Sequence, residues 1–384
     1  MSYRLNPDFA KGLSVYGAES ASKCFNCGNC TAICAHSDER LAIPRHYIRL
    51  MQVGMEEPMR ESMEPWLCYY CGDCSDTCPR VAEPAELMMA ARRWLTAAYD
   101  WTGLSRLMYG SALWEVALLV IFALVVLGLF TLPGSFGFKL LAMHPSALQA
   151  VELENFAPKE IVHWGDLIMA ALLVFFLLSN AARMWSFVMR GTRASISAYV
   201  AEFKELVIHL LTQKKWAKCD PPLRKHWIRH IFLVTGYGTM FVLVVVFLPW
   251  FQINGRQWHW TSLFGYYGTL VLLAVVLWMM LDRAGKRDQI HKHSHLSDWL
   301  FLWLLLFTGL TGIAMHLCRL MGLPLATYWA YMIHLMIAVP MLMVEVPFGK
   351  WAHLLYRPLA VYLKAVQERA RATVPAAKPV LATN

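Results

Sequence analysis

Residues 24–34 read CFNCGNCTAIC, and residues 68–79 read CYYCGDCSDTCP. Both stretches have the spacing C-x2-C-x2-C-x3-C, and each cysteine of the second lies 44 residues after its counterpart in the first. Together they hold eight of the ten cysteines, so they form an internal duplication. The N-terminal sequence MSYRLNPDFAKG has no apolar segment of the kind found in secretory signals. Thiols grouped this tightly therefore indicate metal ligands rather than disulfides.

The spacing is typical of proteins that carry two [4Fe-4S] clusters. Three closely spaced thiolates can bind three corners of one cubane, while the fourth reaches the neighbouring cluster. We therefore expect one cluster on Cys24, Cys27, Cys30 and Cys78, and the other on Cys68, Cys71, Cys74 and Cys34. A structural zinc site would instead need two separate C-x2-C pairs. Ala35 and His36 follow the first motif where the second has a proline, which changes the turn but removes no ligand. The isolated Cys219 and Cys318 are interpreted as structural.

The rest of the chain is dominated by apolar residues. Of 384 residues, 58% are hydrophobic and 16% are charged, against roughly 25% charged residues in an average soluble protein. After residue 108 come six apolar runs that meet the length of about 20 residues needed to cross a bilayer as a helix. They are residues 113–132, 161–184, 231–251, 261–281, 299–317 and 325–346. The sequence predicts a mainly all-α protein with a cytoplasmic domain at 1–108, a six-helix transmembrane domain at 109–355 and an amphipathic tail at 356–384.

The distribution of Lys and Arg predicts the orientation of these helices. Nine lie between the second and third runs, in residues 190–229, and four lie between the fourth and fifth, in residues 283–292. Five more lie in residues 350–371 after the sixth run, whereas the other connections carry few. Because basic loops stay in the cytoplasm, we expect both termini there and a location in the cell (inner) membrane. This bias also accounts for the net charge of +9 without nucleic acid.

Histidines at two depths of the membrane domain predict haem. An ionisable residue inside a spanning helix is costly and is a functional hypothesis by default. His334 and His353 are 19 residues apart, or about 28 Å along one helix, so that helix would offer a ligand near each face of the bilayer. This favours a cytochrome b bundle with two b haems. From their depths we expect His230 to pair with His353 and His163 to pair with His334.

Some of these assignments have alternatives. His226 lies one turn before His230 and could replace it, and His316 near the end of the fifth run could replace His163. The number of haems, one or two, stays open at this point. Glu345 lies one to two turns from His353 and could carry protons for quinone chemistry, although pairing with Lys350 or an arginine is the simpler interpretation.

The first hundred residues resemble the ferredoxin-like C subunit of heterodisulfide reductases. Besides the two cysteine motifs, the matching stretches are Leu5-Asn6-Pro7 and IPRHYIRLMQVG at residues 43–54. The resemblance implies a helical segment between the cysteine groups. It also implies clusters that pass electrons between a flavin-linked partner and a further redox subunit.

The membrane domain resembles two families. The block YMIHLMIAVPMLMVEVPFGKWAHLLY at residues 331–356 is similar to the last helix of the cytochromes b in the nitrate reductase gamma family, whose two haem-binding histidines correspond here to His334 and His353. That family's other two ligands lie on one helix; His230 matches the first, but Met240 stands in place of the second. The whole arrangement is more similar to the citrate/tricarballylate-utilisation B proteins, including the PxGKxxHxxYR ending and a histidine that corresponds to His163.

These features predict a membrane electron-transfer subunit. Electrons would pass between a cytoplasmic flavoprotein or heterodisulfide-reductase-like partner and menaquinone or ubiquinone, through two [4Fe-4S] clusters and two b haems. The chain has no GxGxxG or nucleophile–base motif, so substrate chemistry would belong to the partner. One alternative is a membrane anchor for an iron–sulfur protein without quinone chemistry of its own. Another is a transporter, which should show inverted repeats or broken helices.

Overall fold

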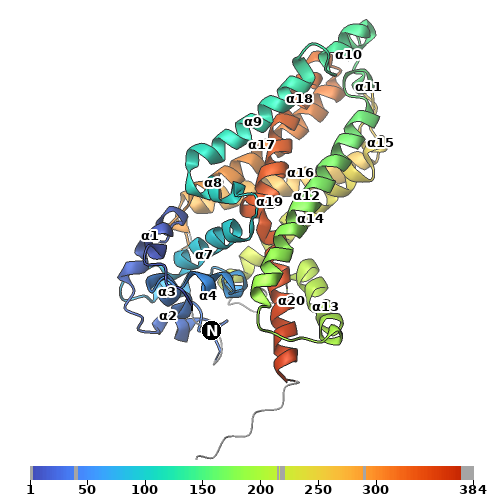
Figure 1. Cartoon of the computed structure of the whole chain (residues 1–384). Coiled ribbons are helices and arrows are strands. Elements are labelled where there is room, and N and C mark those ends of the chain that lie inside the picture. Colours follow the sequence, from blue (N-terminus) through green and yellow to red (C-terminus); the bar gives the residue numbers. More distant parts are fainter. Residues whose placement is uncertain (1–2, 39–41, 214–215, 217–220, 289–290, 373–384) are drawn as a thin grey trace, which may run out of the picture.

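The computed structural model describes residues 3–38, 42–213, 216, 221–288 and 291–372 (Figure 1). Cys219 and the end of the predicted tail, from residue 373, lie outside the described residues. The described part of the chain forms helices and contains no strand, which confirms the all-α prediction. Figure 1 shows a long bundle of helices with the cysteine-bearing segment packed beside one of its ends.

The cysteine-bearing segment is built from short helices around a small apolar core. These helices are α1 (Phe9–Gly12), α2 (Asn29–Ile33), α3 (Arg45–Gln52), α4 (Glu56–Arg60), α5 (Glu64–Leu67), α6 (Asp73–Asp76), α7 (Pro84–Tyr99) and α8 (Leu104–Gly110). Leu13, Ile48, Met51 and Leu87 are buried in their common core. The longer helices α3 and α7 supply most of this core, which leaves the loops before α2 and α6 free to carry the cysteines.

The sequence duplication reappears in the backbone. Gly28 directly precedes α2 and Gly72 directly precedes α6, and both adopt left-handed conformations with φ of 94° and 97°. Asn26 and Tyr70, also 44 residues apart, have φ of 59° and 57°. Side chains at such positive φ values are disfavoured, so glycine suits the turn that lets three cysteines of one loop face a common centre.

Six helices of the bundle are long and apolar enough to span a membrane. Their spanning ranges are Ala112–Thr131 (α9), Lys159–Val188 (α12), Arg224–Val245 (in α14, Pro221–Val245), Thr261–Ala284 (α16), Leu296–Met321 (α17) and Pro324–Phe348 (α18 and its continuation). Five coincide with the predicted runs to within a few residues. The third begins earlier, at Pro221, so His230 lies inside α14 rather than at its start.

The sixth predicted helix is not one continuous α-helix. α18 (Pro324–Pro340) is followed by a π-helical segment (Met341–Glu345), α19 (Val346–Phe348) and a 3-10 turn (Lys350–Ala352), and His353 begins the separate helix α20 (His353–Ala372). Proline has no N–H and disrupts the helical ladder, so Pro340 and Pro347 favour this interruption. The predicted separation of about 28 Å between His334 and His353, which assumed one helix, is therefore not valid.

The two ends of the bundle differ in what surrounds them. α10 (Phe138–Met143), α11 (Leu153–Phe156) and α15 (Leu248–Phe251) lie at the end far from the cysteine-bearing helices (Figure 1). α13 (Ile196–Thr212) and α20 lie at the near end and pack against each other. Trp66, Tyr99 and Tyr356 meet in the apolar cluster that joins α5 and α7 to α20. The predicted amphipathic tail is thus packed within the chain over much of its described length.

Candidate functional site

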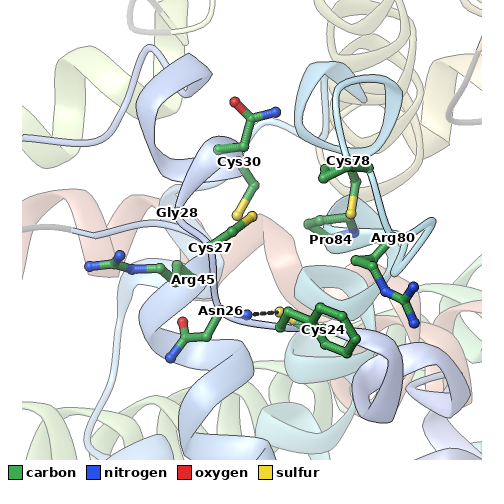
Figure 2. Close-up of a pocket in the computed structure, with 12 residues that line it drawn as sticks. Cys24, Asn26, Cys27, Gly28, Cys30, Arg45, Cys78, Arg80 and Pro84 are labelled. Atoms are coloured by element: carbon green, nitrogen blue, oxygen red, sulfur yellow. Dashed lines mark hydrogen bonds between the residues drawn. The ribbon is translucent and has the colours of Figure 1, made fainter.

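The first set of cysteines surrounds one cavity. Cys24 and Cys27 line it from the loop before α2, Cys30 lines it from the first turn of α2, and Cys78 lines it from the loop after α6 (Figure 2). The backbone N–H of Asn26 donates to Cys24 Sγ at 3.3 Å, and that of Ala82 donates to Cys78 Sγ at 3.4 Å. Three nearby cysteines and one distant cysteine are therefore brought together in the combination expected for one cluster.

The second set is gathered on the other side of the duplication. Cys74 interacts electrostatically with Cys68, Cys71 and Cys34, and Cys34 interacts with Cys68. The Tyr70 N–H donates to Cys68 Sγ at 3.4 Å, the counterpart of the Asn26 bond. Cys30 of the first set also interacts with Cys74, so the two sets are neighbours. Each fourth cysteine thus lies with the other motif, as the spacing predicts.

The donor set fits an iron–sulfur cluster better than a single ion. Burial raises the pKa of the Cys30 thiol to about 11 and that of Cys71 to about 12, so a cation is needed to hold them as thiolates. Among the described residues, which include all eight of these cysteines, no three His, Cys, Asp or Glu side chains lie close enough to hold one metal ion. The corners of a cubane hold four thiolates further apart than one zinc ion does.

The two sets differ in their surroundings. Cys27 of the first set is exposed, and the neighbouring Phe25 is 70% exposed with the Arg80 guanidinium 4.0 Å from its ring centre. The second set faces the bundle. Arg92 of α7 and Arg357 of α20 both donate to the backbone carbonyl of Cys68, the latter at 3.0 Å. The first set therefore lies at the surface, and the second lies against α20 at the near end of the bundle.

Two predicted haem ligands meet at the same end of the bundle. The rings of His230 (α14) and His353 (α20) have centres 6.0 Å apart and planes at 64°. Metal–imidazole bonds are about 2.0 Å long, so two imidazoles at this separation would be able to hold one haem iron between them. His230 and His353 would then be the residues that hold the haem, which would supply one-electron chemistry there.

The protonation of this pair also suits metal binding. His353 Nδ1 donates to the Lys350 carbonyl at 2.6 Å, which leaves the Nε2 lone pair available as a ligand. Burial, and then the proximity of His230, lowers the pKa of His353 to about 3, so its ring is neutral at physiological pH. His230 Nδ1 is buried without a hydrogen-bond partner in the described part of the chain. His226 instead lies 3.3 Å from Asp288, so the structure places His230 and not His226 beside His353.

Aromatic rings connect this histidine pair to the second cysteine set. Tyr69 follows Cys68, and its ring centre lies 5.6 Å from that of Trp216. Trp216 in turn lies 5.4 Å from the ring of His230. The Arg357 guanidinium lies 4.8 Å from the centre of the Tyr69 ring and also binds the Cys68 carbonyl. A continuous line of side-chain contacts thus runs from the second cysteine set to His230 and His353.

The other predicted pair is not brought together in this way. His334 Nδ1 lies 3.1 Å from Thr311 Oγ1, and its ring packs against the backbone of Gly312 in α17. His163 interacts with Asp166 one turn along α12. The described residues show no ring contact between His163 and His334, so this pairing stays a prediction. The alternative ligand His316 lies 2.8 Å from the Tyr266 hydroxyl.

Several residues near the site were missed by the sequence analysis. Arg92 and Trp216 have no sequence pattern that marks them, because their roles depend on contacts between distant segments. Glu115, by contrast, lies inside the first apolar run, where a carboxyl is itself a signal. The simpler expectation is that Glu345 pairs with Lys350 or an arginine. Glu345 does accept a hydrogen bond from the Lys350 backbone N–H, but the Lys350 side chain binds Asp298.

Comparisons with known proteins agree with this arrangement of parts. Residues 20–81 match the 4Fe-4S dicluster domain. The iron–sulfur C subunit of the CoB–CoM heterodisulfide reductase of Methanopyrus kandleri is 33% identical over 96 residues, which are 23% of this chain and 50% of that protein. An Archaeoglobus profundus protein that is named as similar to the heterodisulfide reductase C subunit is 31% identical over 86 residues, or 22% of this chain and 45% of the relative. The match thus spans about half the length of these relatives.

A longer but weaker likeness covers the membrane helices as well. Citrate utilization protein B of Escherichia coli is 25% identical over 331 residues, which are 79% of this chain and 82% of that protein. No solved structure matches the chain. The chain therefore has an iron–sulfur electron-transfer domain similar to the heterodisulfide reductase C subunits, joined to six helices that can span a membrane.

Proposed function

We propose that this protein carries electrons between a cytoplasmic redox partner and the quinone pool through two [4Fe-4S] clusters and two b haems. The observation that carries the proposal is the line of contacts from Cys68 through Tyr69 and Trp216 to His230 and His353. An electron-transfer protein needs neighbouring centres at each step, and this line connects the two cofactor-binding regions that the sequence predicts. The cofactors supply the one-electron chemistry; the chain holds and orders them.

The surface around the first cysteine set is suited to a redox partner. Cys27 and Phe25 are exposed there, and Arg45 and Arg80 line the same cavity. Exposed apolar rings rimmed by arginines favour an acidic protein surface, such as that of a flavoprotein or a heterodisulfide-reductase-like protein. Electrons would enter or leave at Cys24, Cys27, Cys30 and Cys78, and Cys34, Cys68, Cys71 and Cys74 would hold the inner cluster.

The membrane end of the route depends on the histidines. His230 and His353 would hold the haem next to the inner cluster, and His334 with His163 would hold a second haem deeper in the bundle. Helix α20, which carries Arg357, Lys364, Arg369 and Arg371, lies at the same end of the bundle as the cysteine-bearing helices (Figure 1). This supports a cytoplasmic position for both termini and a location in the cell (inner) membrane. Quinone, which dissolves in the bilayer, would react at the bundle.

The visible spectrum of the purified full-length protein, with iron, sulfide and haem counted per chain, tests the proposal. We expect the reduced bands of b haem at two haems per chain, with about eight non-haem irons from two [4Fe-4S] clusters. Cys30→Ser and Cys74→Ser should each alter one cluster, whereas Cys318→Ser should alter neither. Intact iron–sulfur signals without haem, or without electron exchange with a quinone analogue, would instead support a membrane anchor that has no quinone chemistry.

A further inference from the structure

Two buried carboxyl groups without an ion-pair partner among the described residues lie close together at the end of the bundle near the cysteine-bearing helices. Glu115 of α9 is 1% exposed, and neither of its side-chain oxygens has a hydrogen-bond partner in the described part of the chain. Glu345 is fully buried; its Oε2 accepts from the Lys350 backbone N–H at 3.1 Å, and its Oε1 has no partner there either. Buried polar groups are nearly always paired, so two such carboxyls require an explanation.

The fold brings the two carboxyls together. α9 contacts the π-helical segment that ends at Glu345, and Leu119, Val344 and Phe348 share one apolar cluster. Glu115 precedes Leu119 by one turn, and its carboxyl interacts electrostatically with that of Glu345. π-helical segments are rare and often occur at functional sites. Gly349 leaves room for the Glu345 carboxyl, because a Cβ atom at this position would collide with it.

The nearby cations are already engaged elsewhere. Asp298 binds the Lys350 side chain and lies 3.7 Å from Arg93 and 3.6 Å from Arg283. The remaining titratable groups that face the pair are the Tyr109 hydroxyl of α8 and, beyond Asp298, the His295 ring. None of these groups forms an ion pair with Glu115 or Glu345 among the contacts of the described residues. Lys350 acts electrostatically on both carboxyls and Arg93 acts on Glu115, but neither forms an ion pair with them, so burial and the repulsion between two like charges favour a pair that holds one proton.

We propose that Glu115 and Glu345 share one exchangeable proton and form the site that loads protons from the cytoplasm for the reduction of a quinone. The inference rests on the proposed function. A quinone that accepts two electrons, which the clusters and haems of the proposed route would supply, takes up two protons. The pair supplies one when a carboxyl O–H bond breaks and a quinol O–H bond forms, and water supplies the other as well as the proton that restores the pair. Lys350, whose backbone N–H binds Glu345, has a 36% exposed side chain, so solvent lies close to the pair.

Redox-induced infrared difference spectra of the full-length protein test this proposal. We expect a carboxylic-acid C=O band that changes on reduction at neutral pH and shifts in D2O. Glu115→Gln and Glu345→Gln should each remove or displace it, and the matched control Glu368→Gln, at a 56% exposed position of α20, should not. Glu115→Gln and Glu345→Gln should each lower the rate of quinone reduction by roughly 100-fold, which is the effect expected when a proton donor is lost.

Each outcome has a defined meaning. Glu345→Asp keeps an ionisable group and should restore part of the rate, which a purely structural role of the side-chain length would not predict. Haem and cluster spectra of every variant establish that it is folded. No redox-sensitive carboxylic-acid band, or wild-type quinone reduction in both glutamine variants, overturns the proposal. If the wild-type protein itself does not reduce quinone but shows the band, the proposed function fails while the shared proton stands.

Discussion

The two predicted histidine pairs were derived from the same argument about depth, yet the structure treats them differently. His230 and His353 lie with ring centres 6.0 Å apart beside the inner cysteine set. His163 and His334 lie on α12 and α18, and each contacts other residues instead. Depth along a helix predicts at which level a ligand lies, but rotation of the helix decides which way it points. His353 is oriented toward His230 by the interruption of the helix before α20. A prediction from depth alone does not include that interruption.

The largest expected effect is loss of one haem from the first pair. His353→Ala removes one of the two proposed haem ligands of this pair, so the protein should lose one b haem per chain and retain both clusters. The pyridine haemochrome assay and iron–sulfur EPR measure the two quantities. His226→Ala is the matched control, because His226 pairs with Asp288 and should leave the haem count unchanged. If His353→Ala still contained two haems per chain, His353 would not be a haem ligand.

The second pair is tested by the same assay with a different comparison. His334→Leu should remove the other haem, because α18 carries no other histidine. If His163 is the partner, His163→Leu should have the same effect and His316→Leu should not. The reverse result would assign the site to His316, and an unchanged haem content in His334→Leu would show that only the first pair binds haem.

A smaller effect is expected from the contact line that distinguishes the first pair. Trp216→Leu removes the ring between Tyr69 and His230, so stopped-flow reduction of haem by electrons from the clusters should slow severalfold. Cluster and haem contents should not change. Trp303→Leu is the control, since Trp303 lies on α17 and stacks on Phe307 away from this line. Equal rates in the wild type and Trp216→Leu would mean that electron transfer from the clusters to the haem does not depend on this contact.

The smallest effect is expected at Gly349, in the interrupted segment that orients His353. Gly349→Ala places a methyl group against the Glu345 carboxyl, so we expect a loss of about 1–3 kcal/mol in stability and a broadened spectrum of the first haem only. Thermal unfolding in detergent and low-temperature spectra measure these changes. Gly165→Ala, where a methyl group meets open space, should have little effect on either.

Much of the fold follows from local sequence patterns. The duplicated cysteine motifs have a fixed spacing, and the six apolar runs are continuous stretches of sequence. The structure places the motifs and five of the six runs as expected, because each depends on neighbouring residues. The boundaries at residues 108 and 355 stay predictions. The break at Pro340 and Gly349 was visible as residue types, but the π-helical segment depends on tertiary packing, so one continuous helix was the wrong expectation.

The site was predictable where spacing determines contact. Cys78 lies with Cys24, Cys27 and Cys30, as expected for a motif in which each cluster takes its fourth ligand from the other copy. Trp216 and Arg357 meet the cysteine-bearing helices only through folding, and the sequence contains no sign of it. Glu115 could have been found, since a carboxyl within an apolar run is costly unless it has a function.

Pulsed EPR of the dithionite-free, partly reduced protein measures the central claim most directly. A reduced [4Fe-4S] cluster near a ferric haem relaxes faster than an isolated one, so its relaxation reports how close the two centres lie. If His230 and His353 hold a haem beside the inner cluster, we expect fast relaxation of that cluster in the wild type. Relaxation should be slow in His353→Ala and should change little in His334→Leu. Relaxation that is the same in all three proteins would contradict this claim.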